Sequence, residues 1–401
     1  MSMSTDRPEA VVAVLNCGSS SIKFALFDAA AAEPPRRPWW GGQVQGIGGP
    51  APCLLPQDGP ARPLAPGAER PYDEALALIR TVLRERLGAT PVRAVAHRVV
   101  HGGAAHAAAL RVDAAALAEL RGYIPLAPLH QPFALEAMEV LLQERPELPQ
   151  VACFDTAFHH TLPEVEQLLP LPHAYRAHGL RRYGFHGLSY EYQSLVLPER
   201  HGELARGRCI VAHLGSGASL CALQGLRSVA TTMGFSALDG LMMGTRCGAL
   251  DPGALLYLME VEGLSPQDLG QLLYHRSGLL GLSGRSADPR ELLALEAEDP
   301  RCAAALALYV RRIVRELGAL VAVLGGLDLL VFTAGVGEHL AEIRRRVAEG
   351  LAFLGVVLDG EANARHARVI SSAASALRVA VEPTNEEWVA ACQALALLRP
   401  V

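Results

Sequence analysis

A glycine- and serine-containing turn between two hydrophobic runs is the first part of the chain suited to chemistry. The run that begins at Val11 breaks at Asn16, turns through Gly18 and Ser21, and resumes around Lys23. Glycine lets the backbone approach an anion, hydroxyls and amides donate to its oxygens, and lysine adds a positive charge. The pattern predicts two strands joined by a phosphate-binding turn. No GxxxxGK[ST] motif occurs in the sequence, so this turn is not a P-loop.

Similar glycine turns recur later in the chain. Residues 209–223, CIVAHLGSGASLCAL, again run from a strand through a Gly/Ser turn into a second strand. Either hairpin alone is also typical of an ordinary α/β protein, but two of them, one per half, predict a duplicated fold. A third glycine turn, residues 333–338, follows the strand-like run 329–332 and suits an adenosine or phosphate contact.

Further candidates lie at the ends of hydrophobic runs, where α/β enzymes place their sites. They are Arg98, Asp155, His186, Arg246 and the pair Glu386–Glu387. Each has a structural alternative. Arg98 could form an ion pair, His186 a loop hydrogen bond and Asp155 a helix cap. The two glutamates could simply favour the N-terminus of a final helix.

The elements that must position these residues alternate between helices and strands. Helical patterns cover residues 75–87, 113–121, 133–144, 265–273, 288–297, 302–324 and 386–398. Strand patterns, besides the two hairpins, cover residues 92–100, 150–154 and 329–333. The alternation predicts an α/β architecture with mixed sheets. Residues 29–70 are rich in Ala, Pro and Gly, and we expect irregular or edge-strand structure there, outside the core.

Composition bounds the class of protein. The chain has 401 residues, enough for two domains with full cores. No run of about eighteen apolar residues indicates a membrane span. A net charge of −5 argues against nucleic acid as a partner. The first ten residues have no hydrophobic signal core, which favours the cytoplasm. The eight cysteines are scattered without a CxxC pair, so we expect most to be small core residues.

Taken together, these motifs resemble the acetate and propionate kinase family, within the sugar kinase and actin superfamily. The resemblance extends along the whole chain and rests on long motifs in a fixed order: LNCGSSSIKF, AHRVVHGG, PLAPLH, VACFDTAFHH, RRYGFHGLS, HLGSGAS, MGFSALDGLMMGTRCGALDPG, SGLLGLSGRSADPR, VFTAGVGEH and EPTNEE. It implies a duplicated, actin-like (ribonuclease H-like) α/β fold of two domains with mixed sheets and an active-site cleft between them. Residues 1–155 would form the acyl-substrate domain, with 386–401 packing back on it, and residues 156–385 the nucleotide-binding domain.

The activity implied by the resemblance is reversible, in-line transfer of the ATP γ-phosphoryl group to acetate, giving acetyl phosphate and ADP. A carboxylate is already ionised at neutral pH, so the reaction needs no strong general base. It must instead bring two anions together and stabilise charge on the phosphoryl group. Arginine, histidine and a metal ion suit that task.

The family's catalytic roles fall on four residues. Arg98 would hold the substrate carboxylate, Arg246 would bridge it to the phosphoryl group, and His186 would donate to the equatorial oxygens. Asp155 matches the family's essential aspartate and would orient arginine or metal-bound water. Acid–base work by Asp155 is an alternative.

The resemblance also assigns binding residues. Mg²⁺, or alternatively Mn²⁺, would lie near Asn16 and Glu386, largely through water, with Glu387 as a substitute. ATP would contact Ser21, Lys23, His213, Leu214, Gly215, Ser216, Gly217, Asp288, Pro289, Arg290, Gly335, Val336, Gly337, Glu338 and His339. The acyl group would lie in a small apolar pocket formed by Val100, Leu129, Phe185 and Ala237.

The chain departs from the common family pattern at several positions. HLGNG is HLGSG here, with Ser216, and GIGEN is GVGEH, with His339. LHNP becomes LHQP, with Gln131, and GTSH becomes GLSY, with Leu188 and Tyr190. These changes lie among nucleotide contacts and supporting residues, so they bear on nucleotide preference and turnover. Ala237 stands where many members have proline, and the smaller wall favours admission of propionate.

Three alternatives to an acetate kinase remain. Propionate, butyrate or another short carboxylate would use the same residues. A sugar acceptor would need a base beside a hydroxyl and several polar contacts, whereas the predicted pocket is apolar. A non-catalytic ATP-binding relative should have lost one of the four catalytic residues, and all four are present. The family implies a homodimer and a phosphate acyltransferase that makes or uses the acyl phosphate.

Overall fold

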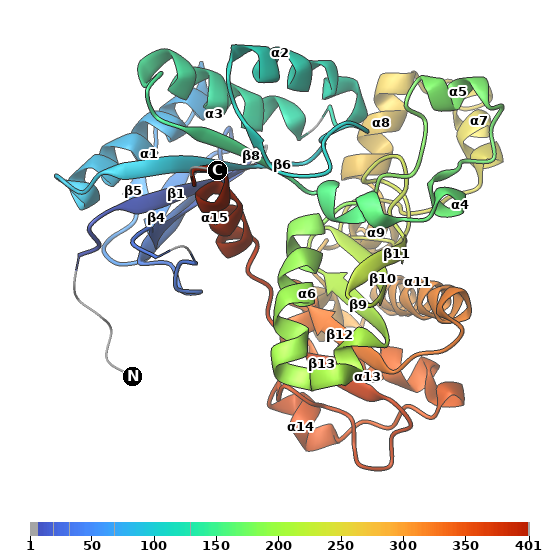
Figure 1. Ribbon diagram of the computed structural model, residues 1–401. Coiled ribbons are helices and arrows are strands. Elements are labelled where there is room, and N and C mark those ends of the chain that lie inside the picture. The colour runs from blue at the N-terminus through green and yellow to red at the C-terminus, as the bar shows by residue number, and fades with distance from the viewer. Residues whose placement is uncertain (1–6, 19, 32, 68, 129, 400–401) are drawn as a thin grey trace. The chain divides into compact units, whose positions relative to one another are not determined.

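The chain divides into two compact units. The computed structural model describes residues 7–399 except residues 19, 32, 68 and 129. Unit 1 comprises Met1–Ala157 and Asn385–Val401, and unit 2 comprises Phe158–Thr384 (Figure 1). That unit 1 takes the acyl substrate and unit 2 the nucleotide stays a prediction.

Unit 1 is built on an eight-stranded mixed sheet. β1 (Val11–Cys17) and β2 (Ser21–Asp28) form an antiparallel hairpin, and β6 (Val92–Val99) pairs parallel with β1. Every side chain of β1 except Asn16 is buried, as expected of a central strand covered on both faces. The order is β5-β4-β3-β2-β1-β6-β8-β7. The remaining strands are β3 (Trp40–Gln45), β4 (Cys53–Pro56), β5 (Arg62–Pro63), β7 (Leu110–Arg111) and β8 (Gln150–Phe154).

Helices cover both faces of the unit 1 sheet. Successive side chains of a strand point to opposite faces, and alternate residues of β1, such as Ala13 and Leu15, pack with Leu76 and Ile79 of α1 (Pro71–Leu87). α3 (Gln131–Glu144) packs beside them on β1 and β6 and against α2 (Ala114–Gly122). The last helix, α15 (Glu386–Leu397), packs on β1, β6 and β8 (Figure 1).

The segment 29–70 corrects one expectation. It does form edge strands, β3 to β5, at one side of the sheet. However, Trp40, Val44 and Leu54 are fully buried and belong to the same core cluster as β1 and α1. The prediction that this segment lies outside the core is therefore wrong, because a few large apolar residues within a Pro- and Gly-rich stretch suffice to anchor it.

Unit 2 contains a five-stranded sheet of order β11-β10-β9-β12-β13. β9 (Arg208–Leu214) and β10 (Ala218–Gln224) form the second hairpin, and β12 (Leu329–Thr333) pairs parallel with β9. β11 (Arg227–Thr231) and β13 (Arg378–Val381) are the edges. The sheet core includes Val211, Cys221 and Val331, which pack with Tyr190 and Leu197 of α6 (Gly187–His201).

The long helix α11 (Pro300–Leu324) packs on β9, β10 and β11. It begins where the Asp299 side chain accepts from the Arg301 amide and ends at Gly325, whose φ is 69°. The other helices of unit 2 are α4 (Glu164–Gln167), α5 (Ala174–Ala177), α7 (Pro252–Glu260), α8 (Pro266–His275), α9 (Gly278–Ser283), α10 (Pro289–Leu295), α12 (Ala334–His339), α13 (Ala341–Gly350) and α14 (Gly360–Ala364).

The two sheets repeat one topology. In unit 1 the strands β3-β2-β1-β6-β8 run antiparallel, antiparallel, parallel and parallel to their neighbours. In unit 2 the strands β11-β10-β9-β12-β13 follow the same sequence of directions. The duplicated fold predicted from the paired hairpins is therefore confirmed, as is the actin-like α/β architecture that the family resemblance implied.

Every helix predicted from the sequence is present, but several helices were not predicted. α6, α7 and α13 are the longest of these. α6 begins with Gly187 and contains Pro198, both poor helix formers, so its sequence gives little local signal. The predicted third glycine turn is also different: residues 334–339 form the short helix α12.

Two expectations, about membrane spans and about the cysteines, can be compared with the described residues. Among them, no helix is both long and apolar enough to cross a membrane. All eight cysteines lie among the described residues, and none of them forms a disulfide. Those at positions 17, 153, 209, 221 and 302 are buried, which confirms that most serve as small core residues.

Candidate active site

The first group of candidate residues lies in unit 1, around Arg98 near the end of β6. The Arg98 Nε donates to Asp155 Oδ1 at 3.0 Å, and its Nη2 donates to Asp155 Oδ2 at 2.7 Å. Asp155 directly follows β8, the strand beside β6, so adjacent strand ends place the two side chains together. Its side chain is only 2% exposed. This two-point ion pair fixes the plane of the guanidinium group.

Asn16 and Glu386 approach the same guanidinium. Arg98 Nη1 lies 3.4 Å from Asn16 Oδ1 and 3.5 Å from Glu386 Oε2. Asn16 is the partly exposed residue of β1, and Glu386 begins α15, whose N-cap Asn385 accepts from the Trp388 amide. Asp155, Asn16 and Glu386 therefore surround Arg98. All four were predicted from the sequence, and all four lie in unit 1.

The oxygen donors of this group fit magnesium chemistry. Mg²⁺ prefers oxygen ligands, retains several waters, and uses one or two carboxylates together with substrate phosphates. Asn16 and Glu386 supply one amide and one carboxylate oxygen, both directed at the same Arg98 nitrogen. Among the described residues, no group of three or more His, Cys, Asp or Glu side chains is placed to hold a metal ion alone. The set therefore suits a water-rich ion that also binds phosphate.

Charge dominates this group. Burial by itself would lower the pKa of Arg98, but the carboxylates of Asp155 and Glu386 outweigh it and raise the pKa overall. Burial and the neighbouring Glu386 raise the pKa of Glu387. Arg98 is thus permanently cationic and held by carboxylates.

The first predicted phosphate turn lies beside this group. The Gly18 amide donates to the Ser21 carbonyl at 2.8 Å, which closes the turn. Lys23 is exposed on β2, directly opposite Asn16 in the hairpin register. Lys23 and Glu387 also line a cavity of about 470 Å³ together with residues of β3. Lys23 therefore lines a cavity, and its contact with ATP stays a prediction. Ser19, which lies within this turn, is outside the described residues.

The second group of candidates lies in unit 2, around His186. This residue is the N-cap of α6 and has a left-handed backbone, φ 59° and ψ 27°. A non-glycine residue pays about 1 kcal/mol for this conformation, so the surrounding contacts must hold it. The His186 ring stacks on His213 of β9 with centroids 4.2 Å apart and planes inclined by 14°.

Hydroxyl groups orient the two imidazoles. His186 Nδ1 lies 2.8 Å from Ser219 Oγ, and Ser219 Oγ lies 2.5 Å from the Tyr190 hydroxyl. His213 Nδ1 lies 2.9 Å from Ser189 Oγ. If Tyr190 donates to Ser219 and Ser219 donates to His186 Nδ1, the proton of His186 is on Nε2. That tautomer makes His186 a donor on the side away from Ser219.

Gly217 brings the remaining candidate of unit 2 to the same place. A Cβ at Gly217 would lie 3.0 Å from His186 Nε2 and 3.6 Å from Arg246 Nη1. The glycine therefore allows the β9–β10 turn to approach both side chains closely. Arg246 Nη1 also donates to the Ala237 carbonyl at 3.3 Å. His186, Arg246 and the second phosphate turn thus form one cluster.

The other residues predicted to contact ATP are spread over unit 2. Gly215 and Ser216 belong to the same turn, which is closed by the Gly215 amide donating to the Gly217 carbonyl at 3.0 Å. Asp288 caps α10 and forms an exposed two-point ion pair with Arg290. Asp288 therefore serves as a helix cap, the structural role considered for Asp155.

Residues 334–339 of α12 are supported from within unit 2. Ala334 has a positive φ of 65°, and its amide donates to Glu338 Oε1 at 2.8 Å. The buried Arg344 donates to the carbonyls of Gly337 and Glu338 at 2.8 and 2.9 Å. The side chain of His339 is 71% exposed. A nucleotide contact by His339 would therefore use a solvent-facing group.

The residues predicted for the acyl pocket belong to both units. Val100 follows β6 in unit 1, whereas Phe185 and Ala237 lie in unit 2. Phe185 is 2% exposed, and its carbonyl lies 2.9 Å from His159 Nε2. Leu129 lies outside the described residues. The acyl pocket itself stays a prediction.

Two supporting residues were not assigned a role from the sequence. Ser219 links His186 to Tyr190, and its signal was its place at the end of the HLGSGAS motif. Gln131 was noted only as a departure from the family pattern. It is fully buried, accepts from the His101 amide at 3.2 Å and donates to the His101 carbonyl at 3.0 Å. It therefore clamps the loop that follows β6.

Comparisons with known proteins agree on one family. A model of the Acetokinase family matches residues 11–392. An acetate kinase of Rhodopseudomonas palustris is 49% identical over 384 residues, covering 94% of this chain and 96% of that protein. The crystal structure of a Francisella tularensis propionate kinase superposes with a TM-score of 0.87 at 34% identity, covering 96% and 98%. The structure of Porphyromonas gingivalis acetate kinase gives a TM-score of 0.85 at 36% identity, covering 97% and 100%.

Proposed function

The chain belongs to the Acetokinase family, and on that premise we propose that it transfers the γ-phosphoryl group of ATP to acetate, giving acetyl phosphate and ADP. The observation that carries the proposal is the Arg98 guanidinium, oriented by Asp155 and flanked by Asn16 and Glu386. A fixed arginine recognises a carboxylate, while the flanking oxygens suit a phosphate-bound Mg²⁺.

In the proposed reaction, one acetate oxygen attacks the γ-phosphorus while the bond to the β–γ bridging oxygen breaks and ADP leaves. Arg98 binds and orients the acetate carboxylate. Arg246 and His186 Nε2 donate to the transferring phosphoryl group, whose charge spreads over its oxygens in the transition state. Asn16 and Glu386 would hold Mg²⁺, or Mn²⁺, largely through water, and the bound ion would add charge neutralisation. Asp155 keeps Arg98 in position and takes no proton from acetate, which is already ionised.

The remaining assignments also belong to the proposal. The β9–β10 turn, Lys23 and α12 would contact the nucleotide, and unit 2 would provide most of these contacts. Propionate is the second candidate substrate, favoured by the small side chain of Ala237. By family, a homodimer and metabolic coupling to a phosphate acyltransferase are expected.

A hydroxylamine trap tests the proposal. Purified protein with MgATP is incubated separately with acetate, propionate, butyrate and a sugar, and acyl hydroxamate and ADP are measured together. We expect hydroxamate and ADP in equal amounts with acetate, and none above background for the Arg246→Ala variant. ADP with the sugar alone would favour a sugar kinase. ATP binding without hydroxamate from any acid would favour a non-catalytic relative and direct attention to Ser216 and His339.

A further inference from the structure

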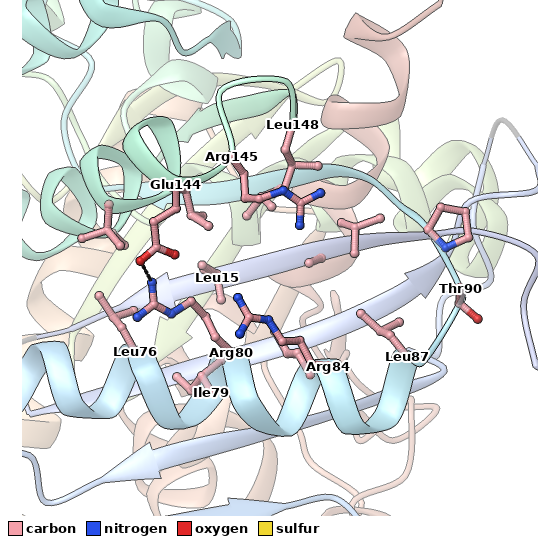
Figure 2. Close-up of a pocket in the computed structure, with 18 of the residues that line it drawn as sticks. Leu15, Leu76, Ile79, Arg80, Arg84, Leu87, Thr90, Glu144, Arg145 and Leu148 are labelled. Carbon is pink, nitrogen blue, oxygen red and sulfur yellow. Dashed lines mark ion pairs between the residues drawn. The ribbon is translucent and has the colours of Figure 1, made fainter.

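An apolar cavity in unit 1 lies apart from the residues proposed for phosphoryl transfer. It occupies about 330 Å³ between α1, α3 and the strands β1 and β6 (Figure 2). Small-molecule sites typically have volumes of about 300–1,000 Å³. Neither Arg98 nor Asp155, Asn16 or Glu386 lines it. The cavity therefore has the size of a ligand site but not the residues of the reaction.

Two of the residues that line the cavity have small side chains. Ala13 of β1 and Ala137 of α3 both line it, and both are buried. Larger residues complete the apolar walls, among them Leu15, Ile79 and Leu141. A void with such walls holds no partner atoms for its lining and favours an apolar occupant over water.

The opening of the cavity carries more arginine than carboxylate side chains. A second, polar cavity of about 470 Å³ adjoins it, and the two share Arg80, Arg84, Glu144 and Arg145. Figure 2 shows Arg84 from α1 and Arg145 from beyond α3 extending over the apolar floor from opposite sides. The residues shared by the two cavities thus carry three guanidinium groups and one carboxylate.

The ion pairs leave positive charge at this opening. Arg80 pairs with Glu144, and Arg145 Nε lies 2.5 Å from Glu147 Oε1. Arg84 is exposed and has no ion pair among the residues that the structure describes. A basic rim above an apolar cavity matches a molecule with an anionic head and an apolar tail.

We propose that this pocket binds a single-chain amphiphile whose carboxylate or phosphate head lies against Arg84 and Arg145 and whose alkyl tail fills the apolar cavity. The proposal does not rest on the phosphoryl-transfer activity, since the two sets of residues do not overlap. A structural alternative is that both arginines only complement the C-termini of α1 and α3. That alternative predicts an effect on stability and no ligand.

Calorimetric titration of the full chain with three ten-carbon probes separates head from tail. Decanoate carries a carboxylate, decyl phosphate a phosphate, and decyltrimethylammonium a positive head on the same tail. All are used below their micelle-forming concentrations, and each titration is run without and with MgADP and acetate, which occupy the proposed reaction site. We expect one molecule of decanoate or decyl phosphate per chain. The better of the two identifies the preferred head, and the cationic probe should bind at least tenfold more weakly.

Chain length gives a second measure. Each buried methylene is worth about 0.8 kcal/mol, or roughly a fourfold change in affinity. The dissociation constant should therefore fall about fourfold per methylene from hexanoate to octanoate and beyond, until the cavity is full. Acetate and inorganic phosphate, which have no tail, should not bind here at measurable affinity.

Matched variants locate the site. The double variant Arg84→Glu with Arg145→Glu should weaken binding at least tenfold, and Ala137→Leu should weaken it by filling the cavity. Arg111→Glu, an equally exposed arginine of unit 1 that lines neither cavity, should change the dissociation constant less than twofold. Circular dichroism checks that each variant is folded. Because the double variant changes only exposed side chains, it keeps the test valid if Ala137→Leu does not fold.

The proposal is overturned by any of four results. These are no binding of either anionic probe, equal binding of the cationic probe, wild-type affinity in the charge-reversed variant, and displacement of the probe by MgADP or acetate. Loss of hydroxamate formation in the trap assay would overturn the proposed function alone, since the titration does not require turnover.

Discussion

The acid that follows the fifth strand of the repeated sheet is used differently in the two units. In unit 1 it is Asp155, whose amide donates to the Val99 carbonyl at 2.9 Å. In unit 2 it is Glu382, whose amide donates to the Phe332 carbonyl at 3.0 Å. Both side chains are almost fully buried, with 2% and 1% exposed. The backbone position is thus the same in both repeats.

The neighbouring strand decides what each acid does. Asp155 meets Arg98, which precedes Val99 on β6. The matching residue before Phe332 on β12 is Val331, which is apolar and buried. Glu382 instead pairs with Arg200 and lies 2.9 Å from His201 Nε2, both at the end of α6. The repeated sheet therefore has two equivalent positions for a buried acid. The strand beside it carries Arg98 in unit 1 and the apolar Val331 in unit 2. This difference separates a group proposed to bind substrate from a structural ion pair.

The two clusters proposed to act in catalysis also differ in chemistry. Unit 1 uses ionised groups, with Arg98 held by carboxylates. Unit 2 orients His186 and His213 through serine hydroxyls and ring stacking. An ion pair in a buried site is strong but costly to break, whereas a hydroxyl network adjusts at smaller cost. Variants should consequently have large effects in unit 1 and graded effects in unit 2.

The largest effect is expected from Asp155→Asn. The amide cannot form the two-point ion pair, so Arg98 loses its orientation and keeps an uncompensated charge. We expect kcat/KM for acetate to fall by about 10³-fold, the scale of losing one preorganised electrostatic contact. The hydroxamate assay measures kcat/KM, and urea unfolding checks that the variant is folded. A loss below tenfold in a folded variant would remove Asp155 from the proposed machinery.

Glu382→Gln should give the opposite result. Removing one partner of a buried ion pair costs about 3 kcal/mol, so the free energy of unfolding of unit 2 should fall by that amount while kcat changes little. Trp39, Trp40 and Trp388, which are all the tryptophans of the chain, lie in unit 1. Fluorescence therefore reports unit 1 and far-ultraviolet circular dichroism reports both. The circular dichroism transition should shift to lower urea, and the fluorescence transition should shift less. A large loss of kcat with unchanged stability would contradict the structural assignment.

Acid should destabilise both units through buried histidines. Burial lowers the pKa of His97 and His101 in unit 1 and of His159 in unit 2 to about 4 each. An unfolded histidine titrates near 6.5, so below that pH the unfolded state takes up protons that the folded state does not. Stability then falls from pH 6.5 towards pH 4, by about 2 kcal/mol per histidine at pH 5.

Urea unfolding at pH 7 and pH 5, followed by tryptophan fluorescence, measures the effect in unit 1. His97→Gln cannot be protonated and should reduce the pH dependence by about 2 kcal/mol. His97 was chosen because its Nε2 lies 2.8 Å from Gln150 Oε1, a partner that a glutamine side chain can also meet. Equal unfolding free energies at the two pH values would contradict the prediction.

Tyr190→Phe should have a moderate effect in unit 2. The variant removes the hydroxyl that meets Ser219, so Ser219 is less strictly oriented towards His186. A neutral hydrogen bond contributes about 1 kcal/mol, which predicts a kcat about fivefold lower with KM for acetate nearly unchanged. Tyr190→His, the residue expected from the family pattern, should restore part of kcat. Equal increases in KM and no rescue would indicate a general packing defect.

At Ala237 the expected effect is on the choice of substrate rather than on the rate with acetate. Replacement by proline adds bulk next to the carbonyl that accepts from Arg246. If Ala237 lines the acyl pocket, the ratio of kcat/KM for propionate to that for acetate should fall by about tenfold, since one methylene is worth 1–3 kcal/mol. An unchanged ratio would show that bulk at this site does not set chain length.

Much of this molecule follows from local sequence signals. The two Gly/Ser hairpins and the strands at 92–99 and 150–154 appear where the sequence predicts them. Helices with Asp or Ser caps, such as α2 after Asp113 and α8 after Ser265, begin one residue after the predicted start. These features depend on neighbours in the chain, because hairpins and helix caps are made from residues a few positions apart.

Other features depend on contacts that are distant in sequence. α6 contains Gly187 and Pro198 and is held by packing on β9, and His186 keeps its left-handed backbone through Ser219, which is 33 residues away. Trp40 is buried although its surroundings are rich in Pro and Gly. Propensity alone could not predict these, because tertiary contacts outweigh differences of about 1 kcal/mol.

The sequence by itself determined the family, the repeated fold and the identities of the residues proposed to act in catalysis. Only the tertiary structure decided that Arg98 is fixed by Asp155 while Glu382, at the matching position, turns to Arg200 and His201. The physical reason is that a buried acid must find a cation among its spatial neighbours. Those neighbours come from other strands and helices, so the single chain does not reveal which cation it will be.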